Sequence, residues 1–174
     1  GIDIHFQTVQ KIIKTEGLTR KYRTRKKNIP YEVKQWMPGE MIEIDVKWVP
    51  GRINGDRYYQ FTAIDCASRW RYLNAYPFCS NGSTIEFVKE LMSVAPFKIK
   101  SIKTDNGSIF TNRYLGYAMS ADPLNIRLHD FDVLCNNVNI QHYLIDPGKP
   151  AQNGKVERSH RTDQQTFYDE LEFK

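Results

Sequence analysis

Apolar and polar residues alternate along residues 41–49, which is the pattern of a β-strand with one buried face. The apolar face comprises Ile42, Ile44, Val46 and Trp48. The opposite face carries Glu43, Asp45, Lys47 and Val49. Two further strand-like runs span 57–64 and 70–76, and only short turns separate the three runs. This spacing predicts an antiparallel meander of three strands.

The pattern then changes to alternating helices and strands. A helix is predicted over 83–95, with Ser83 and Glu86 as a capping box. Its core stripe consists of Phe87, Val88, Leu91, Met92 and Ala95. Strands are predicted over 99–104 and 141–145, and helices over 111–119, 131–138 and 152–171. The chain should therefore fold as an α/β domain with a mixed five-stranded sheet flanked by helices.

The N-terminal part has a different organisation. Residues 5–16 carry apolar side chains at helical spacing, and Gly17 follows as a usual helix-ending residue. Residues 19–38 are polar and basic and contain Pro30 and Pro38, which is typical of a linker. We therefore expect three parts: a short helical segment at 1–18, a basic linker at 19–38 and the α/β domain at 39–174.

Most of the positive charge lies in this N-terminal part. Residues 11–28 contain eight basic residues and one acidic residue, a net charge of +7. The whole chain carries +5, so the remainder carries −2. Such a cluster is typical of proteins that bind a phosphate backbone, although basic segments also serve solubility alone. The residues that we expect to contact DNA here are Arg20, Lys21, Arg23, Arg25, Lys26 and Lys27.

Composition excludes several other classes. The 174 residues are 40% hydrophobic and contain no apolar run long enough to span a bilayer and no signal peptide, so we expect a cytoplasmic protein without a membrane partner. Cys66, Cys79 and Cys135 are odd in number and widely spaced. They indicate neither a disulfide framework nor a zinc site, and reduced thiols in the core are expected.

Three acidic residues stand in distinctive settings. Asp45 follows an apolar strand-like run, Asp105 ends the strand-like run before Asn106-Gly107, and Glu157 lies near the start of the last predicted helix. In an α/β sheet, ligands collect at strand ends where the strand order switches, so Asp45 and Asp105 can meet. Carboxylate oxygens are the ligands that Mg²⁺ or Mn²⁺ prefers, and we expect the three acids to be catalytic metal ligands.

These settings resemble the catalytic core of the DDE transposases of bacterial insertion sequences and of retroviral integrases. The resemblance covers roughly residues 38–170, and its most specific part is the run Asn153-Gly154-Lys155-Val156-Glu157-Arg158-Ser159-His160-Arg161-Thr162, typical of the insertion-sequence branch. It implies a ribonuclease H-like fold. It also implies that residues 1–18 are the remnant of a helix-turn-helix DNA-binding module.

The resemblance further implies the reaction and its partners. Two Mg²⁺ or Mn²⁺ ions would activate water to free a 3′-hydroxyl at an element end, and this hydroxyl would then attack a target strand. The partners would be double-stranded DNA, namely element ends and target DNA, and further copies of the chain in a homo-oligomer, in a bacterial cytoplasm at the nucleoid. On the last helix, the DNA-binding candidates are Asn153, Lys155, Arg158, His160 and Arg161.

Two features depart from the family pattern. Fifty-one residues separate Asp105 from Glu157, whereas many relatives have about 35. We retain Glu157 because of its motif, and place an insertion between about Arg113 and His129, either a surface loop or a flap that touches DNA. The second departure is Ile109, where close relatives commonly carry Glu, which raises the alternative of an inactive element copy.

Two alternative functions therefore stay open: a ribonuclease H-like nuclease that cuts without joining strands, and a catalytically dead transposase-derived DNA-binding protein. Other polar residues are expected to have ordinary roles. Glu43 should be a solvated strand residue, Asp65 with Arg69 should brace a turn, and His142 should pack or form hydrogen bonds rather than bind metal.

Overall fold

The computed structural model describes residues 5–18, 35–113 and 128–170, which belong to two compact units, Gly1–Lys34 and Gln35–Lys174. The first unit contains helix α1 (Phe6–Thr15), as the apolar spacing predicted. His5 caps its start, and Gly17 follows its end with a positive φ of 63°. None of its residues is buried, so its apolar stripe lacks a packing partner within the described part of this unit.

The second unit is built on a mixed five-stranded sheet in the order β3-β2-β1-β4-β5. Strands β1 (Ile42–Trp48), β2 (Tyr59–Asp65) and β3 (Arg71–Tyr76) form the expected antiparallel meander. Strands β4 (Ser101–Thr104) and β5 (Gln141–Leu144) continue the sheet, and β4 is parallel to both β1 and β5. The point where the chain switches from antiparallel to parallel pairing therefore lies between β1 and β4.

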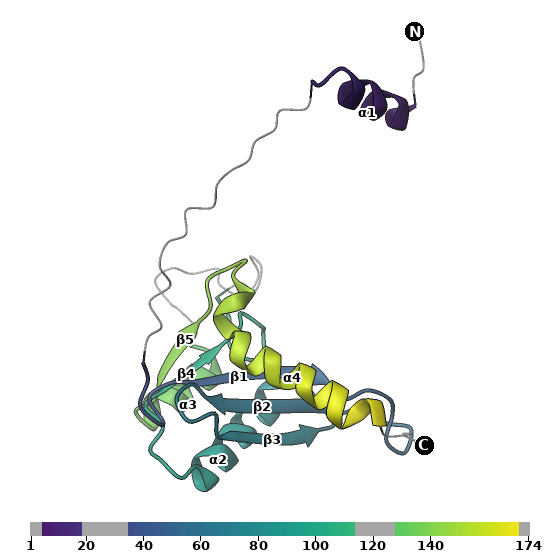
Figure 1. The fold of residues 1–174 in the computed structure, drawn as a ribbon. Coiled ribbons are helices and arrows are strands. Elements are labelled where there is room, and N and C mark those ends of the chain that lie inside the picture. Colours follow the sequence, from purple (N-terminus) through teal and green to yellow (C-terminus); the bar gives the residue numbers. More distant parts are fainter. Residues whose placement is uncertain (1–4, 19–34, 114–127, 171–174) are drawn as a thin grey trace. The chain divides into compact units, whose positions relative to one another are not determined.

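Helices cover both faces of this sheet (Figure 1). Helices α2 (Asn81–Val94) and α3 (Asp130–Asn137) pack together on the face that holds the hydrophobic core. Helix α4 (Gly154–Thr166) crosses β1 and β2 on the opposite face. Short 3₁₀ turns at Pro150–Asn153 and Tyr168–Glu170 flank it. The strand face that carries Asp45 is therefore covered by α4.

The alternation in β1 explains this two-sided arrangement. Ile42 and Ile44 are fully buried in the core with Phe61 of β2 and Ile102 of β4. The polar positions between them face the other way, toward α4. Because successive strand residues point to opposite faces, one strand supplies both the core and the polar surface beneath α4.

Several predicted boundaries need correction. Helix α2 begins at Asn81 and is capped by Ser80, whose hydroxyl accepts a hydrogen bond from the Ser83 amide, so Ser83 and Glu86 do not form its cap. The core stripe of this helix is confirmed. Residues 111–113 are not helical, and the rest of the helix predicted over 111–119 lies outside the described residues, as does most of the proposed insertion.

Two of the three cysteine thiols lie in the core, as expected, and one does not. Cys66 and Cys135 are buried, and burial raises their pKa values to about 11 and about 12. Cys79 is exposed, so the expectation that all three lie in the core is wrong for this residue. Across the parts of the chain that the structure describes, no helix combines the length and the apolar character that a membrane span requires.

Candidate active site

The parallel pairing of β1 and β4 brings Asp45 and Asp105 to one end of the sheet. Glu43 and Lys103 are paired residues in this register, and each acid lies two residues further along its own strand direction. Burial raises the pKa of Asp105, the Gly107 amide lowers it through a hydrogen bond, and the nearby Asp45 carboxylate raises it again. The two carboxylates are therefore close enough to repel each other.

A tight turn fixes the Asp105 carboxylate. Its Oδ1 accepts a hydrogen bond of 2.9 Å from the Gly107 amide. A Cβ atom at Gly107 would lie 3.0 Å from the same oxygen, so a larger residue here would push on the carboxylate. Asn106 donates from Nδ2 to the Ile145 carbonyl, which ties the turn to the end of β5.

Asp45 faces α4 with few partners. Its Oδ1 accepts from the Val46 amide at 2.8 Å, and its Oδ2 lies 3.4 Å from Nδ1 of His160. Lys47, two residues along the strand, donates to the His160 carbonyl. No lysine or arginine forms an ion pair with Asp45 or Asp105 in the described ranges 5–18, 35–113 and 128–170. The charge of the two acids is thus poorly compensated.

Helix α4 turns a polar side toward the sheet. Asn153 donates to the Ile44 carbonyl at 3.2 Å, and Val156 is fully buried. Asp163 receives hydrogen bonds from Arg71 at 2.6 Å and from Gln60 at 2.7 Å. These contacts attach α4 to three strands of the sheet and determine which of its residues remain exposed.

Glu157 lies on the first turn of α4 and is exposed. Within the described residues, no three His, Cys, Asp or Glu side chains are grouped closely enough to hold a metal ion. The structure thus brings together two of the three predicted acids, Asp45 and Asp105. Glu157 is on the helix that covers Asp45, and it does not form a group with the two aspartates.

The predicted DNA contacts divide into three groups. Arg20, Lys21, Arg23, Arg25, Lys26 and Lys27 lie outside the described residues. Asn153 and His160 are only 2% and 9% exposed and contact strand β1, so in this structure they pack α4 on the sheet, and a role in DNA contact stays a prediction. Lys155 lies 3.6 Å from a Glu43 oxygen, whereas Arg158 and Arg161 are exposed.

Glu43 is the main residue that the sequence pattern misjudged. It is 1% exposed rather than solvated, and it contacts β4, the end of β2 and α4. The covering helix lies more than 100 residues away in sequence. A local hydrophobicity pattern contains no signal for such a distant polar partner.

Two smaller expectations have different outcomes. Asp65 does brace the turn after β2, but through Ser68 and the Gly39 amide rather than through the Arg69 side chain. His142 is confirmed as a packing residue: it bonds Asp132 and Thr104 and meets Phe131 edge-on.

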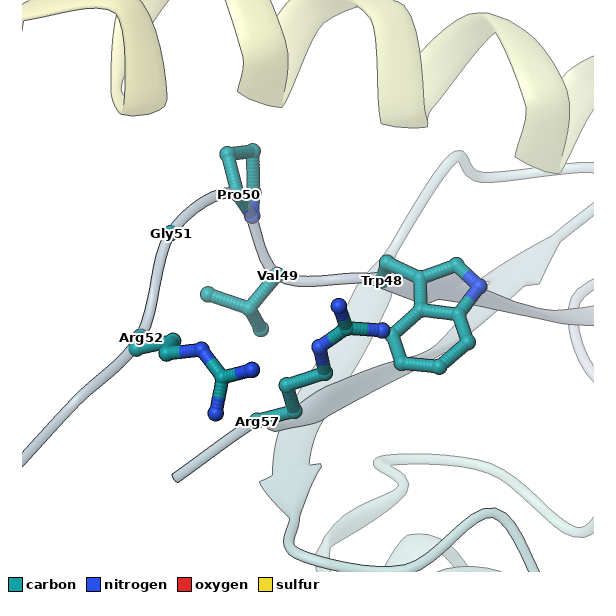
Figure 2. A pocket seen from close by; sticks show the side chains of 6 residues that line it. All are labelled: Trp48, Val49, Pro50, Gly51, Arg52 and Arg57. Carbon is teal, nitrogen blue, oxygen red and sulfur yellow. The ribbon is translucent and has the colours of Figure 1, made fainter. Parts of the chain in front are cut away.

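A cavity of about 400 Å³ opens at the β1–β2 hairpin, away from the acids. Its lining residues are Trp48, Val49, Pro50, Gly51, Arg52 and Arg57. Figure 2 shows the Arg57 side chain beside Trp48, and its guanidinium lies 5.2 Å from the ring centroid. The lining contains two cations and no carboxylate, so the cavity is not suited to a metal ion.

The pair of acids, in contrast, fits a divalent cation. Both supply hard oxygen donors, and the raised pKa of Asp105 reflects burial beside a second carboxylate. A cation between them would remove the repulsion and replace the lost hydration. Next to Asp105, the Asn106 amide oxygen is also buried without a hydrogen-bond partner. The donor set at this end of the sheet is therefore one that Mg²⁺ or Mn²⁺ prefers.

Comparison with known proteins assigns the chain to a class. Residues 36–150 match the model of the integrase core domain, and this range covers Asp45 and Asp105 but ends before Glu157. The chain therefore belongs to the integrase core domain family. The mixed five-stranded sheet agrees with this membership.

A curated relative also belongs with the integrases by its name. The chain is 30% identical over 145 residues to "Putative integrase ORF3" of Spiroplasma virus SpV1-C74, a match that covers 79% of the chain. It spans only 38% of the length of that relative.

Solved structures show the same fold. The HTLV-2 integrase catalytic core in complex with magnesium superposes with a TM-score of 0.55 at 19% identity, covering 76% of this chain and 72% of that one. A chain of the simian T-cell lymphotropic virus intasome, solved with PP2A regulatory subunit B56 gamma, gives 0.61 at 17% identity, covering 79% of this chain and 43% of that one. The BIV integrase core gives 0.52 at 18%, with 77% and 74% coverage. The mixed sheet is thus that of the ribonuclease H-like integrase cores.

Proposed function

We propose that this chain is the catalytic part of a polynucleotidyl transferase that cleaves and joins DNA strands, as integrases and transposases do. The observation that carries the proposal is the pair of partly buried carboxylates, Asp45 and Asp105, at the switch point of a sheet in an integrase core chain. Ligands collect at such switch points in α/β sheets.

Asp45, Asp105 and Glu157 would hold the metal. Two divalent ions supply activation of the attacking oxygen and stabilisation of the leaving oxygen in phosphodiester chemistry. Magnesium in the HTLV-2 integrase core supports this choice of ion for a chain of the same fold. Glu157 would join the two aspartates by a shift of its exposed side chain, because α4 already covers Asp45.

The reaction would proceed in two successive nucleophilic displacements, each at a single phosphorus atom. Water attacks the phosphodiester at an element end, and the bond to the 3′ oxygen breaks to free a 3′-hydroxyl. That hydroxyl then attacks a target phosphodiester, forms one new P–O bond and releases another 3′-hydroxyl. Each step exchanges one P–O bond for another, so no cofactor turnover is needed.

DNA would be held by residues outside this carboxylate pair. Arg158 and Arg161 are exposed on α4, the helix that also carries Glu157. The +7 segment at residues 11–28 would add backbone contacts, and residues 1–18 would be the remnant of a helix-turn-helix module. Assembly as a homo-oligomer on paired element ends is supported by the intasome and by the dimeric and trimeric forms of related cores.

A strand-transfer assay tests this function. The chain is incubated with Mn²⁺ and a labelled duplex that carries a recessed 3′-hydroxyl, and the products are separated by length. Longer joined products are expected, and Asp45→Asn should abolish them. Cleavage without joined products would identify a nuclease. Binding without any product, unchanged by Asp45→Asn, would identify a DNA-binding protein without catalysis.

A further inference from the structure

The buried Glu43 has more polar partners than a strand residue needs. Its Oε2 accepts hydrogen bonds from the backbone amides of Lys155 at 2.9 Å and Val156 at 3.2 Å. Its Oε1 lies 3.1 Å from Nζ of Lys103 and 3.6 Å from Nζ of Lys155. The Cys66 thiol donates to the same oxygen at 3.4 Å. Both oxygens are therefore fully engaged.

We propose that Glu43, Lys103 and Lys155 form a positioning layer that sets the three metal-binding acids in place. The inference rests on the proposed function, because it concerns the same acids. Glu43 is a positioning residue in this scheme and not a metal ligand, because protein donors already occupy both of its oxygens.

The sequence positions of the layer match those of the acids. Glu43 precedes Asp45 by two residues, Lys103 precedes Asp105 by two, and Lys155 precedes Glu157 by two. Side chains two apart on a strand share a face, and Glu43 and Lys103 are direct partners in the parallel register of β1 and β4. Glu43 and Lys103 therefore lie next to the two aspartates on the same face of the sheet, one pair of residues earlier along the strand direction.

The layer also determines where α4 begins. The residue before the helix, Asn153, makes no side-chain capping hydrogen bond. Glu43 takes over this role from β1, because its carboxylate accepts from two amides of the first turn, where the helix dipole favours a negative charge. Together with the hydrogen bond from Asn153 to the Ile44 carbonyl, Glu43 thus fixes the start of α4, and with it Glu157, relative to Asp45.

The charges of the layer are paired within it. Two lysines and one glutamate give it a net charge of +1, and both lysines pair with Glu43 rather than with Asp45 or Asp105. The layer therefore holds the acids in position without neutralising them. Glu40 and Lys100 form a comparable ion pair at 3.2 Å just before the same two strands, but it is more exposed than the pairs of Glu43.

A double-mutant cycle with Mn²⁺ tests the proposal. Calorimetric titration of the full chain with Mn²⁺ is carried out for Glu43→Gln, for Glu157→Gln and for both together. Outer-shell partners of metal ligands typically contribute 10- to 100-fold to affinity. Glu43→Gln should weaken Mn²⁺ binding about 10-fold in the wild-type background and less than about twofold when Glu157 is already replaced. The matched control, Glu40→Gln, should leave the affinity unchanged in both backgrounds.

Hydrogen exchange provides a readout without metal. The Lys155 and Val156 amides should exchange faster in Glu43→Gln than in the wild type, but not in Glu40→Gln. If Glu43→Gln reduces expression of folded protein, Lys103→Gln removes the β4 contact while leaving the helix cap intact, and it should also weaken Mn²⁺ binding.

Three results would overturn the inference. Unchanged Mn²⁺ affinity in Glu43→Gln and Lys103→Gln would show that the layer only stabilises the fold. Equal losses in both backgrounds would show that Glu43 does not act through Glu157. If Asp45→Asn itself bound Mn²⁺ like the wild type, the metal site and the proposed function would fail together with the layer.

Discussion

Glu43 and Asp45 are two carboxylates on the same face of the same strand, yet their surroundings are opposite. Glu43 is 1% exposed and is engaged by two lysines, two backbone amides and a thiol. Asp45 contacts one histidine and its own neighbour's amide, and it lies beside a second acid. A carboxylate with both oxygens hydrogen-bonded and one with few partners are thus only two positions apart on the strand.

The difference shows how one central strand can carry a residue that stabilises the fold next to a residue that is available for chemistry. A carboxylate whose oxygens are fully paired stabilises the packing of α4 and has no capacity left for a metal ion. A carboxylate that repels its neighbour lowers the stability of the metal-free protein, but its oxygens stay available to bind a cation. The following variants distinguish the two roles, from the largest expected effect to the smallest.

Replacing Asp45 by Asn should have the largest effect, and it should fall on activity. Cleavage and strand transfer should decrease on the order of 10³-fold or more, because metal stabilisation of developing charge contributes several kcal/mol. Gel assays of labelled DNA in Mn²⁺ measure this loss. Glu40→Gln, in the segment before the same strand, serves as the control and should retain activity. Wild-type rates in Asp45→Asn would remove Asp45 from the site.

Replacing Glu43 by Ala should instead affect stability. Removing one partner of a buried ionic group costs about 3 to 5 kcal/mol, and here the amides of the α4 first turn also lose their acceptor. Asp45→Ala should leave the metal-free stability unchanged or raise it, because a repulsion with Asp105 is removed. Urea unfolding with chelator present measures both. The same loss in the two variants would contradict the contrast between them.

Arg158 and Arg161 should affect DNA affinity but neither folding nor metal binding. Each phosphate contact contributes about 0.9 to the slope of log affinity against log salt, so the double Ala variant should lower that slope by about 2. Fluorescence anisotropy at several salt concentrations measures it. Lys89, exposed on α2, is the control, and its Ala variant should keep the wild-type slope. An unchanged slope in the arginine variant would exclude α4 as a DNA contact.

His142 on β5 should give the smallest effect, a pH dependence of stability. Burial lowers its pKa from the ordinary 6.5, although the hydrogen bond that its Nδ1 donates to the Asp132 carboxylate acts in the opposite direction. The unfolded chain therefore binds the proton more readily, and stability should decline as the pH falls below 6.5. Thermal unfolding between pH 7.5 and 5 measures this slope, and His142→Gln should reduce it. His5→Gln, in the N-terminal unit, should not.

The sequence predicted the sheet better than the site. Alternation along 41–49 and the short turns after it predicted the meander and the buried side chains of β1. The predicted end of the strand at 104 placed Asp105 just after β4. These features are local, because strand period and turn length are determined by neighbouring residues. Asp45 and Asp105 follow from them once the parallel pairing is known.

Helix α4 was harder to predict, and the reason is physical. It packs on the polar face of β1, so its buried side is itself polar and includes Asn153, His160 and Asp163. Hydrophobic periodicity identifies buried faces by their apolar residues and therefore takes such a side for a solvated one. For the same reason, the pattern predicted that Glu43 would be exposed. Long-range polar pairing is the part of this site that local patterns do not contain.

The most direct test of the account is a crystal structure of the chain with Mn²⁺, located by its anomalous scattering. We predict an ion bound between the carboxylates of Asp45 and Asp105, with Glu157 turned toward it and Glu43 still bonded to the Lys155 and Val156 amides. An ion bound by Glu43, or no ion between the two aspartates at saturating Mn²⁺, would contradict the central claim.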